Sequence, residues 1–128
     1  MATQQDGPEI TLEARGDLST KQFYLVYVDT SGQVGLWIDP DDPAACGIGV
    51  LQNKPTAAGQ PAKVRVSGVA KAIGGATVAA GKKVTCDTAG KLAAAVAGDN
   101  VIGITIEAAA SGKISEILIA HSSTIGDG

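Results

Sequence analysis

Between Gly47 and Ile119 the chain is a series of short apolar segments separated by turn-forming residues. The segments recur at roughly ten-residue spacing, and Gly, Pro and Asp-x-x-Gly sequences lie between them. Short segments with regular turns are typical of an all-β barrel or sandwich. We therefore predict strands near residues 48–51, 62–66, 69–73, 76–78, 83–86, 91–94, 101–106 and 113–119.

A β-hairpin is expected upstream of this region, over residues 22–38. The apolar run from Gln22 to Asp29 is followed by Asp29-Thr30-Ser31-Gly32, and Asp and Gly at these positions form turns. Val34, Leu36 and Ile38 then alternate with other residues on the returning strand. Trp37 lies on the opposite face from these three. It is either exposed at an interface with another protein or fills the second face of a closed barrel.

The chain is predicted to be one β-barrel domain, residues 20–120, between an N-terminal arm, residues 1–19, and a flexible tail, residues 121–128. Within the arm Ile10 and Leu12 alternate with polar residues, which is the pattern of a strand. That strand either adds to the sheet edge of a partner or belongs to the chain's own barrel. Both interpretations are open at this point.

Composition argues against several classes of function. The 128 residues carry ten basic and thirteen acidic side chains, a net charge of −3, and Lys82-Lys83 is the only adjacent basic pair. A nucleic-acid-binding domain is expected to show a basic face. No apolar run approaches the roughly 18 residues of a membrane span, and the polar N-terminus lacks the apolar centre of a signal peptide. We therefore expect synthesis in the cytoplasm, without nucleic-acid or membrane partners.

Metal and cofactor sites are not predicted. Cys46 and Cys86 form no C-x-x-C pair, and His121 is the only histidine. The two cysteines are expected to be small buried apolar residues, although sequence alone leaves a disulfide between them open. The segment Asp39–Pro43 ends the hairpin and lacks the further oxygen ligands of a calcium loop. Asp42 can cap one short helical turn that starts at Pro43 and ends at Gly47.

One pattern suggests an enzyme. Asp29-Thr30-Ser31-Gly32 follows an apolar strand, as the signature of aspartic proteases does, and Asp87-Thr88-Ala89-Gly90 nearly repeats it. That chemistry needs two carboxylates that share a proton. The same sequence is also an ordinary hairpin turn, and we favour the turn and a non-enzymatic protein. A homodimeric aspartic protease using Asp29, or a β-barrel module that binds glycan or peptide, remains an alternative.

Three motifs in order resemble the capsid cement, or head decoration, proteins of tailed phages. They are G-V-L-Q-N-x-P from Gly49, V-x-V-x-G-V from Val64 and G-x-x-x-E-A-A from Gly103, and the similarity covers roughly residues 20–119. The resemblance implies a β-tulip-like barrel with an N-terminal arm. It also implies a homotrimer on the outer surface of the virion capsid, where it binds the major capsid protein and stabilises the expanded head.

Residues for these contacts are predicted from their apolar or aromatic character on strands without an obvious core. They are Ile10, Leu12, Tyr24, Tyr27 and Trp37.

Overall fold

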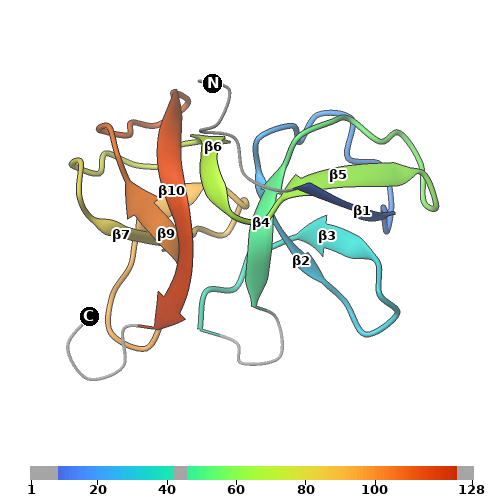
Figure 1. Cartoon of the computed structure of the whole chain (residues 1–128), viewed down its shortest axis with the longest axis horizontal. Helices are drawn as coiled ribbons and strands as arrows, with labels where there is room; N and C mark the ends of the chain where they lie inside the picture. The colour runs from blue at the N-terminus through green and yellow to red at the C-terminus, as the bar shows by residue number, and fades with distance from the viewer. Residues whose placement is uncertain (1–8, 42–45, 124–128) are drawn as a thin grey trace.

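The computed structural model describes residues 9–41 and 46–123, and this part of the chain contains strands and no helix (Figure 1). The strands form two antiparallel sheets of five strands each, which lie side by side. The prediction of an all-β fold is confirmed. The short helical turn expected after Asp41 falls largely on residues 42–45, which lie outside the described residues.

The first sheet is formed by the N-terminal half of the chain, in the order β1-β5-β4-β2-β3. Its strands are β1 (Glu9–Glu13), β2 (Leu25–Val28), β3 (Val34–Leu36), β4 (Gly47–Leu51) and β5 (Pro61–Arg65). The second sheet has the order β6-β10-β9-β7-β8. Its strands are β6 (Gly68–Ile73), β7 (Lys83–Cys86), β8 (Leu92–Ala94), β9 (Asn100–Thr105) and β10 (Ile114–Ser123).

Most predicted strands are present, with three differences. The first hairpin strand starts at Leu25 because Phe23, just before it, has a φ of 71°. The segment 76–78 contributes only one isolated bridge, between Val78 and Ala109. The last strand, β10, continues to Ser123, so His121 lies in a strand rather than in a tail, with Nε2 3.0 Å from the carbonyl oxygen of Ile48.

Each sheet is curled, but neither closes into a barrel. Ala14, the residue after β1, forms a single parallel bridge with Val34 in β3, at the opposite edge of the first sheet. Gly74, the residue after β6, forms the same bridge with Leu92 in β8. The barrel detail of the prediction is therefore not confirmed.

The two sheets are a tandem repeat of one five-stranded unit. Each strand of the first sheet has a counterpart five strands later, and the order of pairing is the same. The register also repeats, because Glu13 pairs with Pro61 as Ile73 pairs with Ile114. In the same way, all three pairs of the β2–β3 hairpin recur in β7–β8. We call residues 9–65 the first repeat and residues 68–123 the second repeat.

The two Asp-Thr-x-Gly sequences occupy equivalent hairpin turns. Asp29 Oδ1 accepts hydrogen bonds from the backbone N–H groups of Ser31 and Gln33, each at 2.9 Å. Asp87 Oδ1 accepts from the N–H groups of Ala89 and Lys91, at 2.8 and 3.0 Å. Each turn closes at a glycine in the left-handed region. The turn interpretation of both sequences is confirmed.

The interior has two clusters of buried side chains, one within the first repeat and one that extends from the second repeat across the junction between them. The first cluster contains Ala14, Leu18, Val26, Val34, Leu51, Ala62 and Val64. The second contains Leu25, Trp37 and Val50 from the first repeat together with residues of the second repeat, among them Ala70, Val84, Leu92, Ile102 and Ile117.

Trp37 is a core residue rather than an exposed one. Its side chain is 1% exposed and packs in the junction between the repeats, so its prediction as an interface residue is wrong. Gly47 makes room for the indole, since a Cβ at this position would overlap the ring. The alternative interpretation, that the tryptophan fills the interior, is the one found.

Residues 9–13, expected to be part of an arm, form the edge strand β1 on β5 of the same chain. Leu12 packs against the first cluster and is half-buried. Apolar alternation on this segment therefore marks a strand of the chain's own sheet, as the second interpretation held. Residues 1–8 of the predicted arm lie outside the described residues.

The repeat yields a prediction at two equivalent glycines. A Cβ at Gly49 would overlap the carbonyl oxygen of Arg65, and a Cβ at Gly103 would overlap that of Leu118. Because these obstacles are backbone atoms, each glycine-to-alanine substitution should lower the free energy of unfolding by about 1 to 3 kcal/mol. Gly16→Ala is the control, since no atom lies within 4 Å of its added Cβ. Denaturant unfolding measures all three, and equal stability among them would contradict the register.

A second prediction tests whether β1 belongs to the first repeat in solution. Leu12→Asp places a charge against the first core and should lower the stability of the protein by about 2 kcal/mol or more. Thr11→Asp, on the exposed face of the same strand, should be nearly silent. Thermal unfolding distinguishes the two. If both variants melt like the parent protein, β1 is a detached arm.

Candidate protein interface

The five residues predicted for an interface do not form one surface. Ile10 is 40% exposed on β1, and Leu12 on the same face packs against the first core. Tyr27 is half-buried and packs against the other cluster, in which Trp37 is fully enclosed. Leu12, Tyr27 and Trp37 therefore serve the packing of their own chain, and Ile10 is the most exposed of the five.

The two tyrosines have local partners. Arg15 Nη1 donates a hydrogen bond of 2.6 Å to the Tyr27 hydroxyl, and its guanidinium carbon lies 5.3 Å from the centroid of the ring. The ring of Tyr24 has the ammonium groups of Lys21 and Lys91 at 4.9 and 5.9 Å. Cations at these distances interact favourably with aromatic faces. Lys91 belongs to the second repeat, so Tyr24 also helps to hold the junction.

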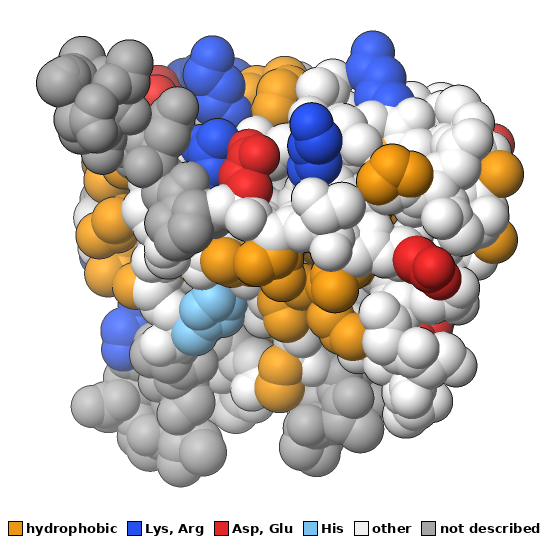
Figure 2. Space-filling view, turned by 45° about the vertical axis from the view of Figure 1, so that its right-hand side comes forward, with side chains coloured by type: hydrophobic (Ala, Val, Ile, Leu, Met, Phe, Trp, Pro, Cys, Tyr) orange, Lys and Arg blue, Asp and Glu red, His pale blue; other side chains and the backbone are white. Residues whose placement is uncertain are grey.

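Hydrophobic side chains nevertheless gather on the surface, across the middle and along one edge of the view in Figure 2. The register identifies an apolar surface on the outer side of the second sheet, where Leu118 pairs with Val69 in β6 and with Ile104 in β9. We call this surface the apolar face. Its apolar members are Val69, Ile73, Ile104, Ile106, Ile114 and Leu118.

The apolar face leaves three large aliphatic side chains in contact with solvent. Leu118, Ile114 and Ile106 are 41%, 45% and 47% exposed. Contiguous exposed apolar side chains on a sheet mark a site of contact with another molecule more often than scattered ones do. Sequence reasoning missed this surface. Its signal is in β10, where Ile114 and Leu118 lie on one face, with Glu116 between them, and Ile117 and Ile119 lie on the other, so that both faces carry apolar residues.

A cleft at the junction lies beside this face, and one of its charged groups, Arg65, has an internal role. Arg65 Nη2 donates to Glu9 Oε2 at 2.8 Å, and Nη1 donates to the carbonyl oxygen of Val69 at 3.0 Å. The Arg65 side chain is 14% exposed, so it ties β1 and β5 to the start of β6. The cleft is lined by Phe23, Gln52, Arg65, Val69, Ala70, Lys71 and Glu116.

The described residues offer little reactive chemistry. Cys86 is buried, and its burial raises the pKa of the thiol to about 12, so the thiol is protonated at neutral pH. Cys46 is exposed, and the two cysteines are not joined in a disulfide. In residues 9–41 and 46–123 no three His, Cys, Asp or Glu side chains are grouped to hold a metal ion. The same residues include no helix that could span a membrane.

Comparisons with known proteins give one similar fold and one matching family. The N base of head fiber gp8.5 of bacteriophage phi29 has a similar fold, with a TM-score of 0.62 and 15% sequence identity over 88% of this chain and 93% of that one. A comparison with curated proteins gave no match. Residues 3–120 match the family described as phage cement protein. The chain therefore belongs to the phage cement protein family and is a structural, decorating protein of the phage capsid.

Proposed function

We propose that the protein, made in the host cytoplasm, binds the outer surface of the expanded phage head as a homotrimer and bridges neighbouring major capsid proteins. The observation that carries this proposal is the family match over residues 3–120. The exposed apolar face supports it, because a decorating protein acts through its contact surfaces. The small aliphatic cores of the two repeats supply a compact scaffold for those contacts.

Reinforcement follows from the number of contacts rather than from the strength of any one. A homotrimer that touches several capsid subunits makes the second and third contacts within one complex, so its overall affinity exceeds that of a single contact. A ligand that binds only the expanded shell also stabilises that state by mass action. The bound protein would thereby help the head to resist the pressure of packaged DNA.

The arrangement of the acidic turn residues supports a structural role over the protease alternative. Asp29 and Asp87 belong to equivalent turns of different repeats, and one oxygen of each carboxylate accepts two backbone hydrogen bonds of its own turn. The second oxygen of Asp29 is 3.8 Å from Arg15 Nη1. Each carboxylate thus has a local function in closing its hairpin.

The proposal predicts selective binding to expanded heads. Purified protein added to bare expanded heads should bind until its sites are filled, and the temperature of head disruption should rise to a plateau at the same occupancy. Unexpanded procapsids and isolated capsid subunits should bind poorly, because they lack the assembled site. Bound copies and disruption temperature are the two measurements. Equal binding to both shell forms, or full occupancy without any gain in disruption temperature, would contradict reinforcement.

The turn role of Asp29 gives a further prediction. Asp29→Asn keeps an oxygen that accepts the two N–H groups and should be nearly silent in thermal unfolding. Asp29→Ala removes the acceptor and should cost about 1 to 2 kcal/mol. Both variants should bind heads as the parent protein does. Peptide cleavage at acidic pH by the parent protein that disappears in Asp29→Asn would instead establish the protease.

A further inference from the structure

The two repeats differ in what covers their outer faces. In the first repeat, Leu25 and Val50 form a cross-strand pair on the outer side of β2 and β4, and both are 0% exposed. Both side chains belong to the second cluster, whose other members are mostly residues of the second repeat. The backbone joins the repeats at the same place, since Leu25 N donates to the carbonyl oxygen of Gly90 at 2.8 Å and Ile73 N to that of Phe23 at 3.0 Å.

Within residues 9–41 and 46–123, no segment covers the equivalent row of the second repeat in this way. Register places Lys83 and Ile104 where the first repeat has Leu25 and Val50, since these pairs occupy matching positions in β7–β9 and β2–β4. Leu118 continues the row across β10. Lys83 and Leu118 are exposed and Ile104 is half-buried.

The contact between the repeats joins two different surfaces. The first repeat contributes the outer side of β2 and β4, at Leu25 and Val50. The second repeat contributes the Asp87 turn and the end of β6 at Ile73. Their counterparts in the first repeat are the Asp29 turn and Glu13. Glu13 and the turn residues Ser31 and Gly32 are exposed, and a shallow depression lies between them. Both halves of a second junction of this kind are therefore present on the surface of one chain.

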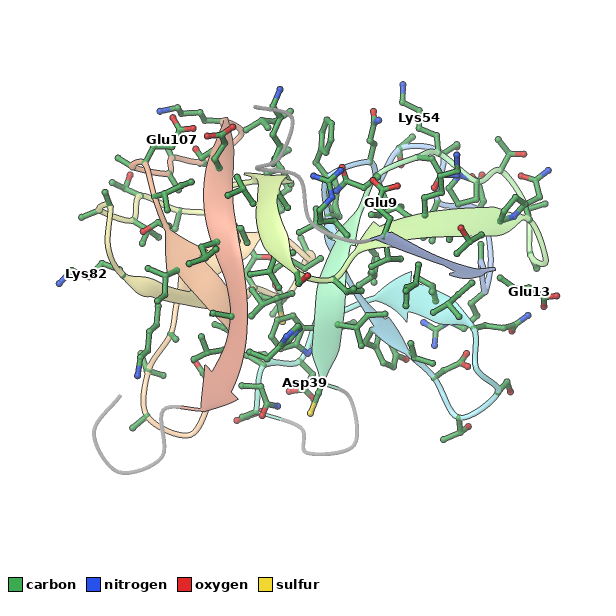
Figure 3. The ribbon with its side chains drawn as sticks, viewed as in Figure 1. Glu9, Glu13, Asp39, Lys54, Lys82 and Glu107 are labelled. Atoms are coloured by element: carbon green, nitrogen blue, oxygen red, sulfur yellow. The ribbon has the colours of Figure 1, made fainter. Side chains whose placement is uncertain are left out.

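We propose that the apolar face of one copy docks on the Asp29 turn and the Glu13 edge of a second copy, repeating the junction between the two repeats. Charge favours this pairing, because the exposed Lys82 and Lys83 border the apolar face and the exposed Glu13 on the docking edge is acidic. Figure 3 places Lys82 and Glu13 at opposite ends of the molecule. The contact is therefore head-to-tail.

A head-to-tail contact forms a closed ring when its rotation closes. The inference rests on the self-association in the proposed function and adds to it the surfaces that meet. Docking of one copy on another in this way leaves the other surfaces of each chain free to bind the capsid.

Cysteine pairing tests the geometry directly. Lys83→Cys and Ser31→Cys are made in separate chains that also carry Cys46→Ser, which removes the exposed native thiol. Because Leu25 contacts Gly90, the equivalent Lys83 of one copy should lie beside Gly32, the neighbour of Ser31, in the next. A mixture of the two variants under mild oxidation should give a disulfide-linked dimer, and neither variant alone should. Linkage of one variant to itself, or no linkage in a mixture that associates, would overturn the proposal.

A surface substitution supplies the second readout. Leu118→Asp should weaken self-association about tenfold or more, measured by sedimentation over a concentration series. Val96→Asp is the matched control, because Val96 is 64% exposed and lies in the loop after β8, outside the apolar face. It should associate as the parent protein does. Thermal unfolding of both variants checks that the fold is kept.

The outcomes separate this inference from the proposed function. A parent protein that is monomeric at every concentration and on the head would defeat self-association, and with it the docking of one copy on another. Unchanged association in Leu118→Asp would defeat the docking surface alone. If Leu118→Asp associates normally but no longer binds heads, the apolar face contacts the capsid and the proposed pairing is wrong.

Discussion

The junction between the two repeats is the contact on which the rest of the molecule depends. Three side chains of the first repeat pack against the core of the second repeat, and each is at most 1% exposed. They are Leu25, Trp37 and Val50. Burial of side chains of this size stabilises a protein by about 1.5 to 3 kcal/mol each. The junction thus joins two small curled sheets, either of which alone would expose this surface to water.

The two repeats have the same strand order, but the junction buries the outer residues of the first repeat and leaves the equivalent residues of the second repeat exposed or half-buried. In the first repeat the row across β2, β4 and β5 consists of Leu25, Val50 and Arg65. The second repeat covers Leu25 and Val50, and Arg65 bonds to Glu9 and to the carbonyl oxygen of Val69. In the second repeat the equivalent of Arg65 is Leu118, which is exposed. A structural protein of the capsid acts by contact, and Ile106, Ile114 and Leu118 are exposed on one side of the second sheet.

Much of the strand order along the chain could be predicted from local pattern, because turns and alternation are properties of neighbouring residues. The hairpin turns at Asp29 and Asp87 follow from Asp and Gly at fixed positions, and both are present. The residues of an interface could not be predicted in this way. Alternation places Trp37 on the face opposite Val34, Leu36 and Ile38, and does not say whether another part of the chain covers that face. In the structure the second repeat covers it. The near-identity of the two Asp-Thr-x-Gly sequences suggests a protease as the alternative to two ordinary turns, and in the structure it marks the internal repeat.

The sequence by itself determined the all-β class, the positions of most strands and the family, since period, turn chemistry and motif order are written locally along the chain. The tertiary structure alone decided that β1 pairs with β5 and that His121 lies in β10 rather than in a tail. It also decided which of two equivalent sheet faces is buried. Local pattern cannot specify these features, because each depends on contacts between residues that are far apart in the chain.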